Sequence, residues 1–149
     1  MVFPLDPDTV SHGIQLAVAP VFLLTAVSGM IAAVAQRLAR IIDRARHVEA
    51  RIKQGSHPTE DAEGYLELAE LRTRGLLANS SIALLTACAF LIGLTIVVLF
   101  LGETIDFPGL RMSIFSFLGG VVCFLLALLC FMAETFVATR LLNFGRLKR

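Results

Sequence analysis

Three long windows without a single charged residue constrain this chain more than any other feature. They cover residues 14–35, 76–101 and 112–133, and none of them contains Asp, Glu, Lys or Arg. A helix needs about 20 apolar residues to cross the roughly 30 Å hydrocarbon core of a bilayer, and each window is longer. A soluble core does not explain them, because a chain of 149 residues has too few polar elements left to cover three such helices. The sequence therefore predicts an all-α membrane protein with three transmembrane helices.

The charges between the windows predict the orientation of these helices. Lys and Arg stay on the cytoplasmic side of a membrane because they are hard to translocate. The first tail holds Asp6 and Asp8 and no basic residue, whereas residues 37–75 hold eight basic residues. Glu103 and Asp106 follow the second window, and the C-terminal tail is basic. These counts predict a periplasmic N-terminus and a cytoplasmic C-terminus.

An apolar seam in steps of three and four residues continues beyond the first window. Its members are Leu24, Val27, Ile31, Val34, Leu38, Ile41, Ala45, Val48 and Ile52. This heptad spacing is typical of a coiled coil and predicts one uninterrupted helix to about Gln54, with a kink at Pro20. A matching seam on the second helix is predicted at Leu66, Ala69, Thr73, Leu76, Ser80, Ala83, Ala87, Phe90, Leu94 and Val97.

Spans one and two are thus expected to extend into a cytoplasmic antiparallel helical hairpin. Its turn is predicted at residues 55–58, and Thr59 is the expected N-cap of the second arm. The charged outer faces of this hairpin are either solvated coiled-coil surface or a binding face. Within one membrane domain, 1–149, the predicted segments are an exported tail (1–11), span one (12–36), the hairpin (37–75), span two (76–102), an exported turn (103–109), span three (110–139) and a cytoplasmic tail (140–149).

One face of span three carries small and polar residues, while its other faces are bulky and apolar, with Phe115, Phe124 and Phe131 among them. The small and polar face consists of Ser113, Ser116, Gly120, Cys123, Ala127, Cys130 and Glu134. Small residues let helix backbones approach closely inside a bilayer, so this stripe is a candidate packing seam. Hydroxyls and a carboxylate also suit the wall of a pore, which three helices can enclose only by oligomerising. Both interpretations stay open.

Glu134 is the candidate functional charge. A carboxylate within a membrane span costs about 2.5–3.5 kcal/mol and is retained with a partner or on a wetted surface. Arg37 and Arg74 lie at the cytoplasmic ends of the neighbouring spans, so a structural ion pair with either is one interpretation. A role in an ion pathway is the other.

The motifs of most enzymes and cofactor sites are missing. The sequence has no HExxH, GxSxG, P-loop or GxGxxG pattern, and its three histidines do not share a segment. No enzymatic activity, metal or cofactor is therefore predicted. Basic residues interleaved with acids, with only Tyr65 as an aromatic, argue against nucleic acid. Contact of Arg37, Arg40 and Arg140 with anionic lipid headgroups is expected instead.

Two blocks carry a resemblance to a known family. Residues 14–25, IQLAVAPVFLLT, and residues 37–46, RLARIIDRAR, resemble an uncharacterised bacterial membrane family, domain of unknown function 2721. The resemblance covers about residues 11–140 and implies a bacterial inner-membrane protein with three spans. It implies no activity and no site residues.

Together these features predict a non-enzymatic integral membrane protein that acts by helix association. Its expected partners are the lipid bilayer and either further copies of itself or other subunits of a larger membrane complex. The alternative is a homo-oligomeric ion channel or pore that passes cations, based on Glu134 and the span-three stripe. The direction in which that stripe points separates the two hypotheses.

Overall fold

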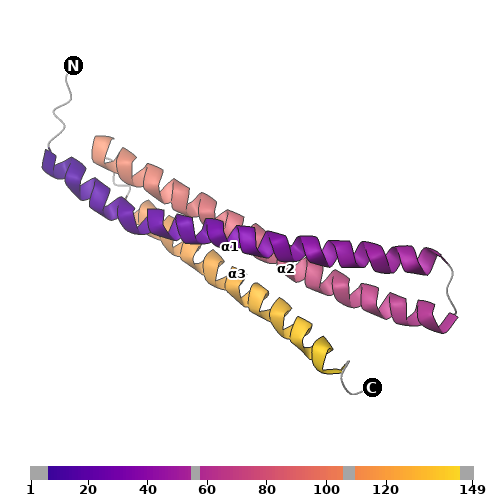
Figure 1. The fold of residues 1–149 in the computed structure, drawn as a ribbon. Helices are drawn as coiled ribbons and strands as arrows, with labels where there is room; N and C mark the ends of the chain where they lie inside the picture. Colours follow the sequence, from indigo (N-terminus) through magenta and orange to yellow (C-terminus); the bar gives the residue numbers. More distant parts are fainter. Residues whose placement is uncertain (1–6, 55–57, 106–109, 145–149) are drawn as a thin grey trace. The chain divides into compact units, whose positions relative to one another are not determined.

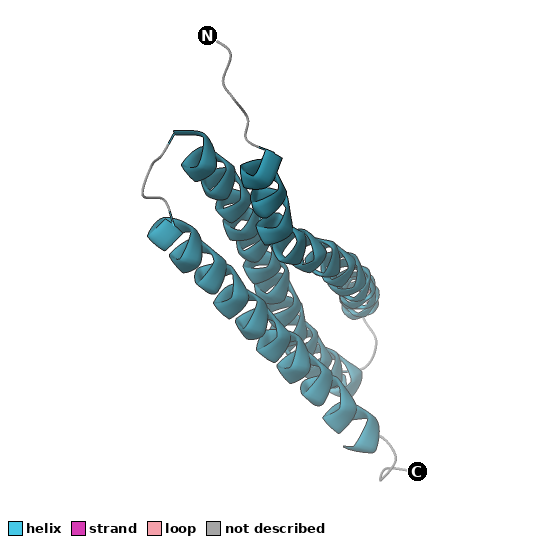
Figure 2. Cartoon of the chain, turned by 90° about the vertical axis from the view of Figure 1, so that its left-hand side faces the viewer, coloured by secondary structure: helices cyan, strands magenta, loops and turns pink. Residues whose placement is uncertain are grey.

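The computed structural model describes residues 7–54, 58–105 and 110–144 and consists of three long helices (Figure 1). They are α1 (Pro7–Lys53), α2 (Pro58–Ile105) and α3 (Leu110–Phe144). Within these ranges there is no strand, as Figure 2 shows. The described residues contain three stretches long and apolar enough to cross a membrane, namely Ala17–Lys53, Ala62–Gly102 and Arg111–Thr139. The predicted class, a multi-pass all-helical membrane protein, is confirmed.

The helix ends differ from the prediction in consistent ways. α1 begins at Pro7 rather than near Ser11, and α2 begins at Pro58 rather than after Thr59. Proline is favoured in the first helical turn, where its missing N–H costs no hydrogen bond and its φ is already helical. α2 continues to Ile105, and α3 continues to Phe144. The predicted segments that fall on residues 1–6, 55–57, 106–109 and 145–149 lie outside the described residues.

The prediction of an uninterrupted first helix is confirmed. α1 runs through Pro20 and through the boundary between apolar and charged sequence without a break. At 1.5 Å per residue, its 47 residues extend about 70 Å, more than twice the roughly 30 Å of a hydrocarbon core. α1 is therefore long enough to continue well beyond the bilayer.

Two compact units make up the structure. The first combines Met1–Ile31 with Leu84–Leu125, and the second combines Ala32–Ala83 with Leu126–Arg149. Each unit contains a part of all three helices.

In the first unit, small residues bring α2 and α3 into close contact. Ser116 Oγ donates a hydrogen bond of 2.9 Å to the carbonyl oxygen of Leu91. A Cβ atom added to Gly120 would lie 2.9 Å from the side chain of Ile92, which is fully buried. The absence of a side chain at Gly120 therefore sets the distance between the two helices here.

In the second unit, α1 and α2 pack through an aliphatic cluster. Ile41, Val48 and Leu71 are buried, and Ala45 and Ile52 pack against them. The members of the predicted α1 seam, from Leu24 to Ile52, are all buried or half-buried, so that seam is confirmed.

The predicted seam of α2 is wrong. Nine of its ten residues are exposed, including Leu66, Leu76 and Phe90, and only Leu94 is half-buried. The face that is actually buried consists of Gly64, Leu71, Ala78, Ser81, Leu85, Cys88, Ile92 and Thr95. Lipid is as apolar as a helix interface, so apolar residues at helical spacing do not by themselves mark the packing face of a membrane span.

Candidate functional site

Glu134 forms the centre of an ion cluster in the second unit. It lies on α3 with 1% of its surface exposed. Arg74 on α2 donates two hydrogen bonds to Glu134 Oε1, from Nε at 3.1 Å and from Nη2 at 2.9 Å. Arg37 Nη2 on α1 lies 3.5 Å from Glu134 Oε2. The sequence offered Arg37 or Arg74 as the partner, and the structure brings both to the same carboxylate.

Arg37 has two further contacts that the sequence did not suggest. Its Nη1 donates a 3.0 Å hydrogen bond to Thr135 Oγ1. Its guanidinium carbon lies 5.1 Å from the centroid of the Phe131 ring, a cation–π distance. Phe131 had been grouped with the bulky faces of span three. Its position three residues before Glu134, almost one helical turn, is the signal that places it near the same arginine.

The charges of this cluster link the three helices through ion pairs and do not suit a bound cation. Two guanidinium groups face one carboxylate, so the cluster carries a net positive charge and repels small cations. Glu134 Oε2 is buried and accepts no hydrogen bond, which leaves Arg37 as its electrostatic partner. Among the described residues there is also no group of three His, Cys, Asp or Glu side chains that could hold a metal.

The small and polar face of α3 is turned toward its own chain in both units. In the first unit, Ser113, Ser116 and Gly120 are buried, and Cys123 is half-buried. In the second unit, Ala127 is buried and Cys130 half-buried, and Ser81 Oγ of α2 donates a 2.9 Å hydrogen bond to the Ala127 carbonyl oxygen. Two serines thus bond to main-chain carbonyls across the α2–α3 interface.

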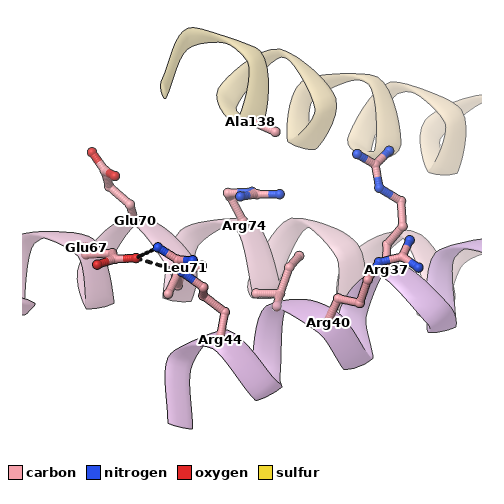
Figure 3. Close-up of a pocket in the computed structure, with 9 residues that line it drawn as sticks. Arg37, Arg40, Arg44, Glu67, Glu70, Leu71, Arg74 and Ala138 are labelled. Atoms are coloured by element: carbon pink, nitrogen blue, oxygen red, sulfur yellow. Dashed lines mark hydrogen bonds and ion pairs between the residues drawn. The ribbon is translucent and has the colours of Figure 1, made fainter. Parts of the chain in front are cut away.

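A pocket of about 680 Å³ lies in the second unit, and both arginines of the ion cluster, Arg37 and Arg74, line it (Figure 3). Its lining is formed by Arg37, Arg40, Ile41, Arg44, Glu67, Glu70, Leu71, Arg74 and Ala138. Arg44 contacts Glu67 Oε1 through Nε at 2.9 Å and Nη2 at 2.7 Å. This group of residues is called the arginine pocket below.

Two of the residues predicted to contact lipid headgroups, Arg37 and Arg40, both line the arginine pocket. Arg37 is half-buried within the ion cluster, and Arg40 is exposed at the arginine pocket. The side chain of Arg140 lies outside the described part of the chain. Glu67, Glu70 and Arg44 were not singled out from the sequence, because their outward helix positions look like ordinary solvated charge.

Three apolar helices joined by Arg37 and Arg74 around the buried Glu134 define a polytopic helical membrane protein. A family model described as "Protein of unknown function (DUF2721)" matches residues 17–144, and the chain belongs to this family. No curated protein and no solved structure matches the chain.

Proposed function

We propose that this protein is a non-enzymatic integral membrane protein that acts by helix association, forming a homo-oligomer in the bilayer. The observation that carries this proposal is an exposed face of small residues on α1. Thr25, Gly29 and Ala33 repeat every four residues, and all three are exposed. A Cβ added at Gly29 would meet nothing within 4 Å. Such a face lets the backbone of another helix approach closely, and dispersion then stabilises the pair.

The other polar positions of span one lie on the exposed surface of the same helix. Gln15, Ser28 and Gln36 are all exposed, although contact of a polar side chain with lipid tails costs free energy. Gln and Ser side chains on an exposed membrane helix form hydrogen bonds with a partner helix. Association along this face would give these side chains hydrogen-bond partners without a change in the backbone of α1. An accessory subunit of a larger complex would use the same face toward a different protein.

The channel alternative has less support. It was based on Glu134 and the α3 stripe, which would have to line water for cations. Glu134 instead contacts two arginines, and the stripe residues are buried or half-buried against their own chain. A carboxylate that two guanidinium groups neutralise offers no attraction for a passing cation.

The proposed location is the bacterial inner membrane, with a periplasmic N-terminus. Basic residues are concentrated in residues 37–75 and in the C-terminal tail. Acidic residues lie in the N-terminal tail, at Asp6 and Asp8, and after span two, at Glu103 and Asp106. The positive-inside rule supports the cytoplasmic assignment of the basic segments. The packed segments of α1 and α2 that follow span one would then be a cytoplasmic helical hairpin.

Site-directed labelling tests this topology. In a background that lacks Cys88, Cys123 and Cys130, a cysteine placed at Asp8 or Asp106 should react with a membrane-impermeant maleimide added to intact spheroplasts. A cysteine at Gln54 or Lys148 should react only after the membrane is permeabilised. The reverse pattern of labelling would contradict the proposed orientation.

A glycine-to-leucine substitution tests the association face. Gly29→Leu should weaken self-association by about tenfold or more, equal to about 1.4 kcal/mol, because the larger side chain holds the partner helix away. The measurement is energy transfer between donor- and acceptor-labelled copies in lipid bilayers, over a range of protein-to-lipid ratios.

Gly93→Leu is the matched control, since Gly93 on α2 also has nothing within 4 Å of an added Cβ. It should leave the energy transfer unchanged. Wild-type protein that stays monomeric at every ratio would contradict the homo-oligomer. An accessory subunit of a larger complex would then be the form of association that is left. Equal effects of the two substitutions would mean that α1 is not the interface.

A further inference from the structure

The arginine pocket contains a concentration of positive charge that the ion pairs do not use up. Four arginines line it, three from α1 (Arg37, Arg40 and Arg44) and one from α2 (Arg74), against two glutamates, Glu67 and Glu70. Glu67 contacts Arg44 at the pocket and Arg51 beyond it. Glu134 pairs with both Arg37 and Arg74, so the four arginines exceed the three carboxylates by one positive charge.

The hydrogen-bond donors of the arginines also show that the pocket has binding capacity that the protein itself does not use. A guanidinium has five N–H donors. Arg74 directs Nε and Nη2 to Glu134, and Arg37 directs Nη1 and Nη2 to Thr135 and Glu134. Arg40 has no hydrogen bond or ion pair within the described ranges of the chain, although it lies on the wall of the pocket. All five N–H donors of the Arg40 guanidinium are therefore open to a ligand.

We propose that the arginine pocket binds a phosphate group. Arginine forks match the oxygen geometry of phosphate, and several together recognise it more strongly than a single lysine does. The pocket of about 680 Å³ has room for an organic group attached to the phosphate as well as for the phosphate itself. Ile41, Leu71 and Ala138 supply the apolar part of the lining for that group.

Two sources offer this chemistry, an anionic phospholipid headgroup and a phosphorylated solute. Figure 3 shows Arg37 reaching from α1 toward α3, with Arg74 between α2 and α3. Glu70 on α2 also lines the pocket and has no ion partner among the described residues, so its carboxylate repels an anion there. A phosphate therefore binds on the Arg40 side of the pocket, and removal of the Glu70 charge strengthens the binding.

A competition experiment on the full chain separates the two sources. The detergent-solubilised protein is titrated with a short-chain fluorescent phosphatidylglycerol at constant ionic strength, and inorganic phosphate is then added as a competitor. Saturable binding of the lipid that phosphate displaces only weakly identifies a headgroup site. Displacement by low concentrations of phosphate identifies a site for a phosphorylated solute. Neither probe binding in a saturable way would overturn the proposal.

Matched variants separate the site from general electrostatic attraction. Arg40→Gln should weaken binding by about tenfold, the loss expected for a charge-assisted hydrogen bond. Arg46→Gln removes an equal charge from an exposed position of α1 outside the pocket and should change the affinity by less than about twofold. Glu70→Gln should tighten binding. Equal losses in Arg40→Gln and Arg46→Gln, or weaker binding in Glu70→Gln, would overturn the proposal. Because these readouts measure ligand affinity, they are independent of self-association.

Discussion

Glu134→Gln is expected to destabilise the folded protein by about 3 kcal/mol. Removing one partner of a buried ion pair costs about 3–5 kcal/mol because the other charge is left uncompensated. Glu134 has only 2% of its side chain exposed, whereas Arg37 and Arg74 keep 30% and 20%, and this exposure favours the lower end of that range. The loss should appear as a lower midpoint of thermal unfolding in detergent.

Glu49→Gln is the control for this substitution. Glu49 forms an ion pair with Lys53 one turn along α1, and 53% of its side chain is exposed. Exposed pairs of this kind contribute little to stability because solvent screens them, so the midpoint should barely move. Similar shifts in the two variants would mean that the burial of Glu134 adds nothing to its interaction with the arginines.

A second substitution shows whether the loss arises from the arginines. Arg74→Gln, added to Glu134→Gln, removes one of the two charges left without a partner and should recover part of the stability. No recovery would contradict the ion-cluster interpretation. The channel hypothesis predicts a different result, namely a Glu134→Gln protein of normal stability with altered conductance in lipid bilayers.

Ile41→Asp is expected to lower stability by a similar amount. Ile41 belongs to the aliphatic cluster with Val48 and Leu71 and is 6% exposed. The substitution removes buried apolar surface and places a carboxylate without a partner among apolar side chains, at a cost of about 3 kcal/mol or more. At about 2–4 °C per kcal/mol for a protein of this size, the unfolding midpoint should fall by about 6–12 °C.

The neighbouring residue provides a matched control for Ile41. Ile42 has the same side chain but is 42% exposed. Ile42→Asp should therefore shift the midpoint by no more than about 2 °C, as surface substitutions change stability by about 0.5 kcal/mol. An unchanged midpoint in Ile41→Asp would mean that the apolar seam of α1 does not stabilise its packing on α2.

The number of spans and the α1 seam could be predicted because both depend on local patterns. Windows without charge identify helices that lipid can surround. The seam of α1 extends into sequence rich in charge, where an apolar residue such as Ile41 or Val48 contrasts with its polar neighbours. That contrast is what helical periodicity detects.

The packing face of α2 could not be predicted in the same way. Phe90 and Leu76 repeat at helical spacing, yet they are exposed, whereas Ser81 and Cys88 are buried. A hydrophobic pattern shows which face of a helix avoids water. Every face of a membrane span avoids water, so the pattern does not show which face packs on another helix. Small residues alone would not have identified this face either, because Ser80, Ala83 and Ala87 are exposed whereas Leu85 and Ile92 are buried.

The sequence by itself determined three membrane-spanning helices, the continuity of α1 and the two alternatives for Glu134, a positive partner or a wetted surface. These follow from the cost of placing charge and unpaired backbone in hydrocarbon, which each segment meets on its own. Only the tertiary structure decided that Arg37 and Arg74 meet the same carboxylate, and that Arg40 remains without a partner among the described side chains. Such contacts join residues on different helices, and their geometry depends on the rotation of each helix about its axis, which no local pattern specifies.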